Sequence, residues 1–498
     1  MPPPPQSGAL EETRLLKQGG LKPGETGTQV AEVGVLGVVC LRTLTLSAAT
    51  ALLFSLNPAS AETLSQALSL AYNNNPTLNA ARAELRATDE NVPQAKSAYR
   101  PTVNGTASAT RSWSEREYLS GSARNTQSTS TSLGLQVQQI LYRGNRTKNG
   151  VAQADAAIQA AREGLKSTEQ SVLFDVATAY MDILQNQAIL ELRKQNVAFL
   201  REQARSARDR FAVGETISTD VSQAEARLSG AISQVRVAEA NLATSRATYQ
   251  MLVGKKPGNL TTGFAVDRLF PKTLQAAIGQ GINSHPSVLA SQYNVDVAQL
   301  AVKIAEGALL PTVSLSGNAS RNWSNNNSNT NVSGSTNSAS ITGQVSIPFY
   351  QGGAAHSKVR QAKETLGQRR IQLDLARDQV RANIVSSWSL LEATIPQIAA
   401  AQAQVKASQL ATRGVIEEQK VGQRTLLDVL NSQAELIDAR IALVQAQRGR
   451  IVASFRVASS VGNLSASNLG LKVATYDPAA HYTAVKDKWF GLRTPDGR

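Results

Sequence analysis

The sequence predicts a mostly helical protein with a membrane β-barrel, built from two repeats of a helix, a β-hairpin and a long helical hairpin. Three observations support this fold class. Short motifs recur at offsets of 210 or 208 residues, and each repeat has two stretches that alternate apolar and polar residues. Each alternating pair is followed by a long run of helix-forming residues with apolar side chains at helical spacing.

The composition excludes several classes of function. The 498 residues carry a formal net charge of +14, which by itself can indicate nucleic acid or an anionic membrane as a partner. Aromatic residues make up only 5%, and acidic residues lie between the basic ones along the predicted helices. We therefore expect a solvated surface and no nucleic-acid partner.

An N-terminal extension and a signal peptide are predicted over residues 1–61. A mostly apolar run ends at Leu56, and small residues follow before the predicted cleavage after Ala61. A transmembrane anchor is the alternative, but Arg42 interrupts the apolar run. Cleavage would remove Cys40, the only cysteine, and with it any disulfide, cysteine nucleophile or cysteine metal ligand.

Two copies of one pattern fill the rest of the chain. Leu64 and Leu274 begin similar helical stretches, and Pro-Thr-Val follows at residues 101–103 and again at 311–313. Repeats of about 200 residues are much longer than any solenoid unit. The predicted divisions are a first repeat at 62–252, an equatorial linker at 253–271, a second repeat at 272–461, and a C-terminal equatorial segment and tail at 462–498.

Each repeat contains two strand-like stretches on either side of a polar loop. In the first stretch, Val103, Ala107 and Trp113 fall on one side of the strand. A period-two strand of about ten residues suits one crossing of an outer membrane, although a soluble hairpin is the alternative. The predicted strands cover about 101–113, 133–142, 311–323 and 341–350.

A long helix and a shorter return helix are predicted to follow each hairpin. Gly214 and Gly422 are expected to end the long helices in a left-handed conformation, and Ser218 or Thr219 to cap the first return helix. Pro396 is expected to kink or interrupt the second long helix. The predicted helices cover 63–98, 145–212, 219–252, 272–308, 354–420 and a final return helix through Leu430 and Ile451, with tips at about 212–219 and 420–426.

The lengths of these elements constrain the assembly. At 1.5 Å per residue the long helix spans about 100 Å, and the two shorter helices of about 50 and 55 Å match it end to end. Four strands cannot close a membrane barrel, and open edges are not tolerated in lipid, so several copies must share one barrel. Two copies would leave an interior filled by side chains, whereas three leave a lumen, which the long helices below require.

The motifs, in their order, resemble those of the TolC-type outer-membrane efflux proteins over about 62–470. They are the Pro-Thr-Val openings, LYRGNR at 141–146, FYQGG at 349–353, and the Val-Gly and Asp-Val pairs of the two tips; the tail at 476–495 is similar to that of alphaproteobacterial members. The resemblance implies a homotrimer with a twelve-stranded barrel in outer-membrane lipid, continued by a long periplasmic α-helical barrel. It also implies a passive exit duct, without a cofactor, for a tripartite efflux pump or type I secretion system. A periplasmic adaptor would join the duct to an inner-membrane pump or secretion ATPase.

The resemblance also implies roles for residues at the tips. Val213, Gly214, Val421 and Gly422 match positions where adaptor hairpins dock. For the two glycines, plain helix capping is the alternative.

Three further residues match the closed periplasmic entrance of the family. Asp220 and Arg424 match positions that hold the inner and outer hairpins together, and for Asp220 a favourable place in the first helical turn is the alternative. Asp428 matches an acidic ring at the pore constriction, which would bind cations.

Two positions depart from the family pattern. Asn431 stands where a second aspartate is usual, so the ring would hold three carboxylates instead of six and cation block would be weaker. Gln419 stands where an aromatic residue is usual, five residues before Arg424, so the closed-state network would be wired differently.

Enzymatic motifs are not found. His285, His356 and His481 are dispersed without a metalloprotease spacing, and residues 254–258 lack the spacing of a phosphate-binding loop. The alternative function is a periplasmic adaptor or scaffolding protein of an export system, but an adaptor would place extra β-domains around one helical hairpin.

Overall fold

The computed structural model describes residues 62–117, 119, 121, 123–261, 266–327 and 332–497. The predicted signal peptide and its cleavage site at Ala61 lie outside these residues. Among the described helices, none combines the length and the apolar character needed to cross a membrane.

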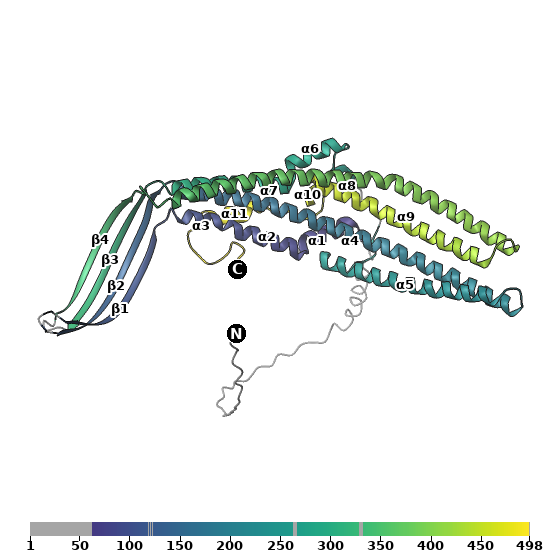
Figure 1. The fold of residues 1–498 in the computed structure, drawn as a ribbon, viewed down its shortest axis with the longest axis horizontal. Helices are drawn as coiled ribbons and strands as arrows, with labels where there is room; N and C mark the ends of the chain where they lie inside the picture. Colours follow the sequence, from purple (N-terminus) through teal and green to yellow (C-terminus); the bar gives the residue numbers. More distant parts are fainter. Residues whose placement is uncertain are drawn as a thin grey trace, which may run out of the picture. The chain divides into compact units, whose positions relative to one another are not determined.

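The two predicted repeats are confirmed (Figure 1). In each one, short helices lead to a β-hairpin, and a long helix and a shorter return helix follow. The first repeat comprises α1 (Leu64–Asn74), α2 (Pro76–Asp89), α3 (Asn91–Ser97), β1 (Thr102–Glu117), β2 (Ala123–Arg143), α4 (Arg146–Ala212) and α5 (Ser218–Val253). The second comprises α6 (Leu274–Ser284), α7 (Pro286–Gly307), β3 (Thr312–Asn327), β4 (Val332–Ser346), α8 (Ala354–Lys420) and α9 (Leu426–Val461). The short helices η1 (Asp267–Leu269), α10 (Ala466–Leu469) and α11 (Pro478–Val485) lie outside the repeats.

The first helix of each repeat is broken, whereas the sequence predicted continuous helices at 63–98 and 272–308. Asn75 and His285 precede prolines and adopt extended backbone, because a residue before proline is sterically kept from the helical region. The same two residues then cap the next helix, since Asn75 accepts from the amides of Thr77 and Leu78. The two breaks fall at equivalent positions of the repeats, 210 residues apart.

The long helices have the predicted lengths. α4 and α8 each contain 67 residues, and α5 and α9 each contain 36. α4 packs against α7 and α5, so two shorter helices accompany one long helix as expected (Figure 1). α8 continues through Pro396, so the predicted interruption is wrong. Pro396 is exposed, so water can reach the carbonyl that lacks its helical donor there.

The four strands form one antiparallel sheet in the order β1-β2-β3-β4. The register sorts their side chains into an apolar face and a polar face. The apolar face carries Val103, Ala107, Trp113, Leu133, Leu135, Val137, Leu315, Trp323, Ile341 and Val345. The polar face carries Ser, Thr, Asn and Gln, including hydroxyl pairs between Ser108 and Ser132 (2.7 Å) and between Ser320 and Ser338 (2.8 Å).

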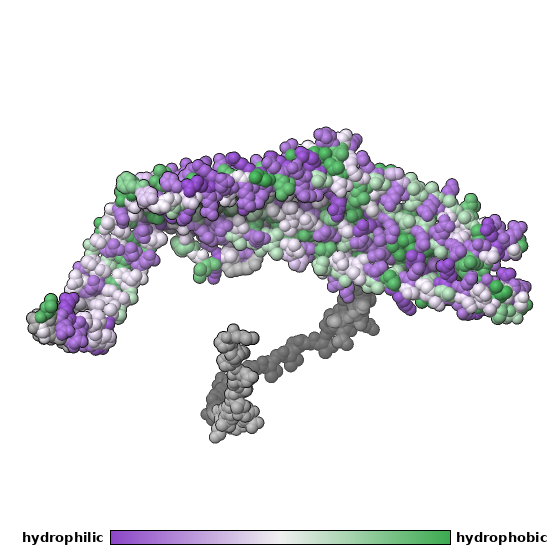
Figure 2. Space-filling model, viewed as in Figure 1, coloured by the Kyte–Doolittle hydropathy of each residue, from purple (hydrophilic) through white to green (hydrophobic). Residues whose placement is uncertain are grey.

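The strands extend further toward the hairpin ends than predicted, but β4 ends at Ser346, before the predicted end at 350. β1 and β3 each contain 16 residues, and β2 contains 21. Their extra length is Ser- and Asn-rich, and in Figure 2 hydrophilic residues gather near the hairpin ends while the rest of the sheet is mostly pale. Hydrophobic alternation reports which residues meet an apolar environment, whereas the hydrogen-bonded ladder continues beyond it.

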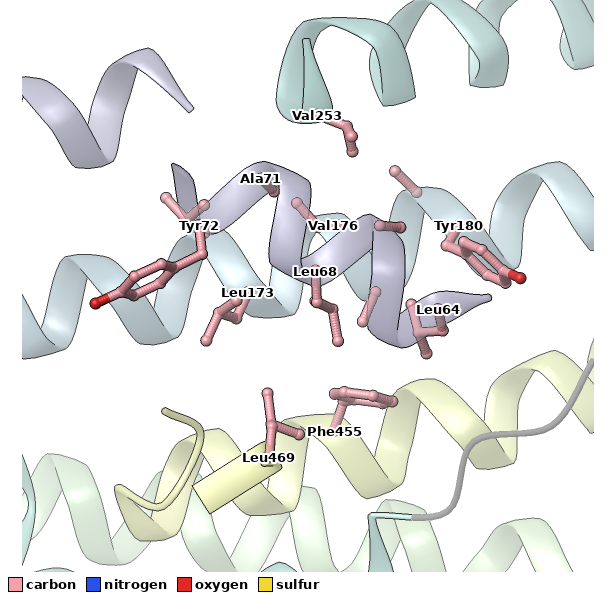
Figure 3. Close-up of a cluster of buried hydrophobic side chains, with 14 of the residues drawn as sticks. Leu64, Leu68, Ala71, Tyr72, Leu173, Val176, Tyr180, Val253, Phe455 and Leu469 are labelled. Atoms are coloured by element: carbon pink, nitrogen blue, oxygen red, sulfur yellow. The ribbon is translucent and has the colours of Figure 1, made fainter. Parts of the chain in front are cut away.

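The largest apolar core is shared by side chains of α1, α4 and α9 (Figure 3). Leu68, Leu173 and Phe455 are fully buried there. The linker after α5 closes this core, because Glu62 forms a parallel bridge with Leu260 and its carboxylate accepts a 2.6 Å hydrogen bond from the Tyr249 hydroxyl. The largest buried apolar cluster of the described residues thus joins the start of the first repeat, both long-hairpin helices α4 and α9, and the linker.

Candidate functional site

The two helical tips share one backbone geometry. Gly214 and Gly422 both have φ +80°, as predicted for left-handed residues at helix ends. In each turn the glycine amide bonds the carbonyl three residues earlier, and the next amide bonds the carbonyl five residues earlier. A Cβ at either glycine would meet nothing within 4 Å, so glycine is required by the backbone angle and not by crowding.

The tips present apolar side chains to the surroundings. Val213 and Val421 are each 71% exposed, immediately before the two glycines. Equal exposure at equivalent positions gives the chain two similar apolar points at the ends of its hairpins.

The first return helix begins differently from the prediction. Ile217 occupies the N-cap position of α5, so neither Ser218 nor Thr219 caps it, and Ile217 offers no side-chain acceptor. The Thr216 hydroxyl instead donates to the carboxylate of Asp220 in the first helical turn. Asp220 thus faces the positive end of the helix, where a carboxylate is favoured.

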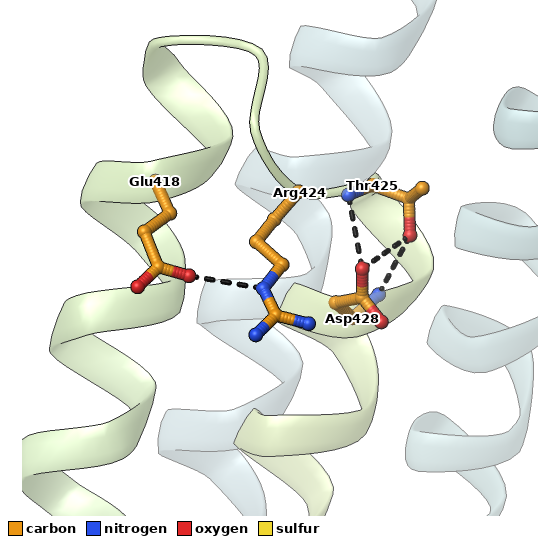
Figure 4. Close-up of polar contacts among 4 residues, drawn as sticks. All are labelled: Glu418, Arg424, Thr425 and Asp428. Atoms are coloured by element: carbon orange, nitrogen blue, oxygen red, sulfur yellow. Dashed lines mark hydrogen bonds and ion pairs between the residues drawn. The ribbon is translucent and has the colours of Figure 1, made fainter.

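The second return helix has a capping box at its N-terminus (Figure 4). The Thr425 hydroxyl accepts from the Asp428 amide (3.2 Å), and Asp428 Oδ2 accepts from the Thr425 amide (3.0 Å), which forms a capping box. Arg424 Nε reaches back across the turn to Glu418 Oε2 (3.0 Å). The start of α9 is therefore tied to itself and to the end of α8.

The capping box also sets the charge of Asp428. The Thr425 amide and then the Thr425 hydroxyl donate to its carboxylate, and these bonds hold the pKa of Asp428 below its usual range. Both donors end on Oδ2. Asp428 is therefore anionic at neutral pH, with Oδ1 outside the capping box.

Asp220 and Arg424 each bond within their own hairpin, through Thr216 and Glu418 respectively. The geometry of one chain thus places both residues at the tips without joining them. Their predicted role between hairpins stays a prediction. Gln419 is half-buried, and its carbonyl accepts the Gly422 amide at 3.1 Å.

Asn431 links the two repeats. Arg227 of α5 donates from Nη2 to Asn431 Oδ1 of α9 at 2.9 Å. Farther from the tips, Arg193 of α4 lies 3.6 Å from Asp438 of α9, and Gln433 donates to Asn196 at 3.4 Å. Polar groups of the two hairpins therefore meet along α9.

Sequence reasoning missed Arg227 and Glu418. Arg227 bonds Asn431 of α9, 204 residues away, so no local spacing could pair them. Glu418 and Arg424 are separated by a turn, so no helical spacing could pair them.

Two of the three histidines have visible structural contacts. His285 caps α7, and burial lowers its pKa, while His481 Nδ1 lies 3.0 Å from Asp89 Oδ2. Within the described ranges, no group of three or more His, Cys, Asp or Glu residues is placed to hold a metal ion.

Comparison with known proteins identifies the family. The sequence matches the family described as Outer membrane efflux protein over residues 67–255 and 277–463. It is similar to Outer membrane efflux protein BepC of Brucella suis biovar 1 (strain 1330), with 46% identity over 437 residues, which cover 88% of this chain and 93% of that protein. It is also similar to Outer membrane protein TolC of Vibrio cholerae serotype O1, with 28% identity over 427 residues, covering 83% and 95%.

The fold likeness is equally extensive. The crystal structure of the Campylobacter jejuni CmeC outer membrane channel has a TM-score of 0.70 and 16% identity, and the likeness covers 85% of this chain and 89% of that one. Brucella is an alphaproteobacterium, which agrees with the character expected from the tail. The chain therefore belongs to the outer membrane efflux protein family of TolC type, whose members are non-enzymatic outer-membrane channels for tripartite efflux pumps or type I secretion.

Proposed function

We propose that three copies of this chain close one twelve-stranded barrel in the outer membrane and form a passive exit duct. The observation that carries this proposal is the four-stranded sheet, in which β1 and β4 each have one edge unpaired among the described strands. Open edges are not tolerated in lipid, so β1 of one copy must pair with β4 of another. Four strands from each of three copies give twelve strands, enough for a lumen.

The two faces of the sheet suit this barrel. From Val313 to Trp323 is ten residues, or about 33 Å along the strand, which a tilt of about 40° reduces to about 25 Å across the membrane. The guanidinium groups of Arg111 and Arg321 lie over the rings of Trp113 and Trp323 and mark one border of this band. The Ser- and Asn-rich face would line the lumen.

The tips would form the periplasmic entrance. The exposed Val213 and Val421, each beside a left-handed glycine, offer adaptor hairpins two equivalent docking points, with Gly214 and Gly422 allowing close approach. The adaptor would connect the duct to an inner-membrane pump or secretion ATPase.

Three copies of Asp428 would form the cation-binding ring at the constriction. The carboxylate is ionised, and its Oδ1 lies outside the capping box. Asp220 and Arg424 would hold the entrance closed through contacts with neighbouring hairpins, and Gln419 would shape that network beside Arg424.

Edge pairing between copies can be tested directly. In a Cys40→Ser background, Ala107→Cys in β1 is combined in turn with a cysteine at each position from 339 to 343 in β4. We expect covalent trimers in the membrane at one register and a solution mass in detergent of three subunits. A monomer mass without crosslinks between copies would overturn the proposal.

The alternative of a periplasmic adaptor or scaffold accounts for fewer observations. An adaptor needs one helical hairpin, whereas this chain has two in tandem together with an amphipathic four-stranded sheet. Recovery from the aqueous fraction of lysed cells without detergent would favour the adaptor.

A further inference from the structure

The segment after α11 exposes three large apolar side chains within four residues. Trp489 is 67% exposed, Phe490 is 90% exposed and Leu492 is 102% exposed. Neighbouring large apolar side chains in water are unfavourable and usually mark an interaction surface. We call residues 486–493 the C-terminal knob.

The C-terminal knob is fixed to the helical body. Lys96 of α3 lies 2.6 Å from Asp487 Oδ1, and Arg100 Nη1 donates to the Lys488 carbonyl at 2.9 Å. The Arg100 guanidinium also stacks over the Trp489 ring at 4.5 Å. Just before the knob, Val485 is fully buried.

The knob is also closed on itself. Gly491 has φ +111°, which turns the chain, and Lys488 Nζ donates to the Arg493 carbonyl. The aromatic and leucine side chains are therefore displayed on a folded loop, not on an extended tail.

The contacts of the knob place it where the chain enters the membrane. Arg100 lies two residues before β1, and the apolar face of the sheet begins at Val103. Tyr99 is exposed beside Arg100, and its carbonyl accepts from Gln139 of β2 at 3.1 Å. Trp and Tyr concentrate at membrane–water interfaces, because their rings are amphipathic. The knob is therefore fixed beside the start of the sheet, at the level expected for lipid headgroups on the periplasmic side.

The charge of the knob suits the same environment. Lys486, Lys488 and Arg493 supply three cations, while Asp487 is engaged by Lys96. The hydrogen bond from Lys96 keeps the pKa of Asp487 below its usual range, so this pair persists at neutral pH. Basic residues beside apolar ones favour a surface of anionic phospholipid.

We propose that the C-terminal knob is an interfacial anchor that inserts Trp489, Phe490 and Leu492 among the phospholipids of the periplasmic leaflet, with its cations beside anionic headgroups. The anchor would fix the height of the helical body at the membrane surface. It is distinct from the barrel, because it lies after both repeats. A neighbouring subunit is the competing occupant of this surface.

The test uses the full chain in lipid nanodiscs. In a Cys40→Ser background, a bimane fluorophore is attached to Phe490→Cys, and the bilayer contains phosphatidylethanolamine, phosphatidylglycerol and a lipid spin-labelled near its headgroup. The matched control is bimane on Val213→Cys, which is similarly exposed but lies beyond a helix of 67 residues. We expect several-fold stronger quenching at residue 490 than at residue 213.

Two results would overturn the proposal. Quenching at residue 490 no stronger than at 213, with blue-shifted emission, would place the knob against a neighbouring subunit instead. Quenching that does not fall when phosphatidylglycerol is replaced by phosphatidylcholine would remove the role of anionic headgroups. Adding Lys486→Gln and Arg493→Gln to the labelled protein should abolish that dependence on phosphatidylglycerol while leaving Trp489, Leu492 and the label at residue 490 unchanged.

Discussion

The two tips of this chain have the same backbone but different side-chain bonds. Gly214 and Gly422 share φ +80°, and the valines before them are equally exposed. α5 begins at Ile217, which has no capping side chain, whereas α9 begins with the capping box of Thr425. Each tip also has an ion pair across its turn, Arg210 with Glu215 at 3.4 Å in the first and Arg424 with Glu418 at 3.0 Å in the second.

The difference shows which features of a repeat are fixed by geometry. A left-handed turn needs glycine, and the first turn of a helix favours aspartate, so both copies keep these residues. At the same offset, Thr216 aligns with Arg424 and Ile217 with Thr425. The start of α9 is therefore expected to fray less readily than the start of α5.

The largest effect is expected when the shared glycines are replaced. Gly214→Val and Gly422→Val should each strain their turn by about 1–2 kcal/mol, because a β-branched residue at φ +80° is sterically disfavoured. Hydrogen exchange should show faster exchange of the turn and adjoining helix ends in both variants.

Gly230→Val in α5 and Gly449→Val in α9 are matched controls. A Cβ at either position meets nothing within 4 Å, and both glycines lie inside helices. If either control raised hydrogen exchange at the tips as much as the turn variants do, the backbone angle would not explain why both turns contain glycine.

The capping difference gives the next largest effect. Thr425→Ala removes the side-chain half of the capping box and should cost about 1 kcal/mol at the start of α9. Amide exchange at residues 426–430 should then approach the rate at 218–222, where no such cap exists. Thr425→Ser keeps the hydroxyl and should exchange like the unchanged protein; if it does not, the capping box is not what separates the two tips.

The sequence predicted the repeats and the tips better than the joints between elements. The helices α4 and α8, the left-handed glycines and the sheet follow from periodicity and turn chemistry, which are local. The breaks at Asn75 and His285 do have a local signal, because each residue precedes a proline and is kept from the helical region. The bond from Arg227 to Asn431 joins residues 204 apart, and such tertiary contacts leave no local signal.

The proposed latch residues Arg424 and Asp220 should have a moderate effect on the closed state. Arg424→Gln and Asp220→Asn are each expected to raise single-channel conductance in planar bilayers. Exposed ion pairs contribute up to about 1 kcal/mol, so the open population should rise by no more than about fivefold.

Double variants separate the two possible partners of Arg424. If the contact with Glu418 matters, Glu418→Gln/Arg424→Gln should equal either single variant in conductance. If Arg424 instead contacts Asp220 across hairpins, Asp220→Asn/Arg424→Gln should have the same conductance as either of its single variants. Unchanged conductance in both single variants would remove the proposed latch.

A smaller effect is expected on block by Mg²⁺ when Asn431, which stands where the family usually has a second aspartate, is changed. Asn431→Asp alone should strengthen block by Mg²⁺ only slightly, because Arg227 lies 2.9 Å from residue 431 and would neutralise the new carboxylate. Arg227→Gln/Asn431→Asp should strengthen the block clearly. Arg236→Gln, which removes another exposed arginine of α5, is the control and should leave the block unchanged. Strong block in Asn431→Asp alone would show that Arg227 is engaged elsewhere in the trimer.

The smallest expected effect is the pH dependence of this block. The Thr425 amide and hydroxyl lower the pKa of Asp428, so its carboxylate keeps its charge below the value of about 3.9 at which an ordinary aspartate is half protonated. Block by Mg²⁺ at Asp428 should therefore persist down to pH about 4 and disappear only as the pH falls through the lowered pKa. Thr425→Ala removes the hydroxyl donor, so the loss of block should move to higher pH, toward the ordinary value. Conductance titrations of the two proteins measure the shift, and coincident curves would mean that the capping box does not control the charge of the ring.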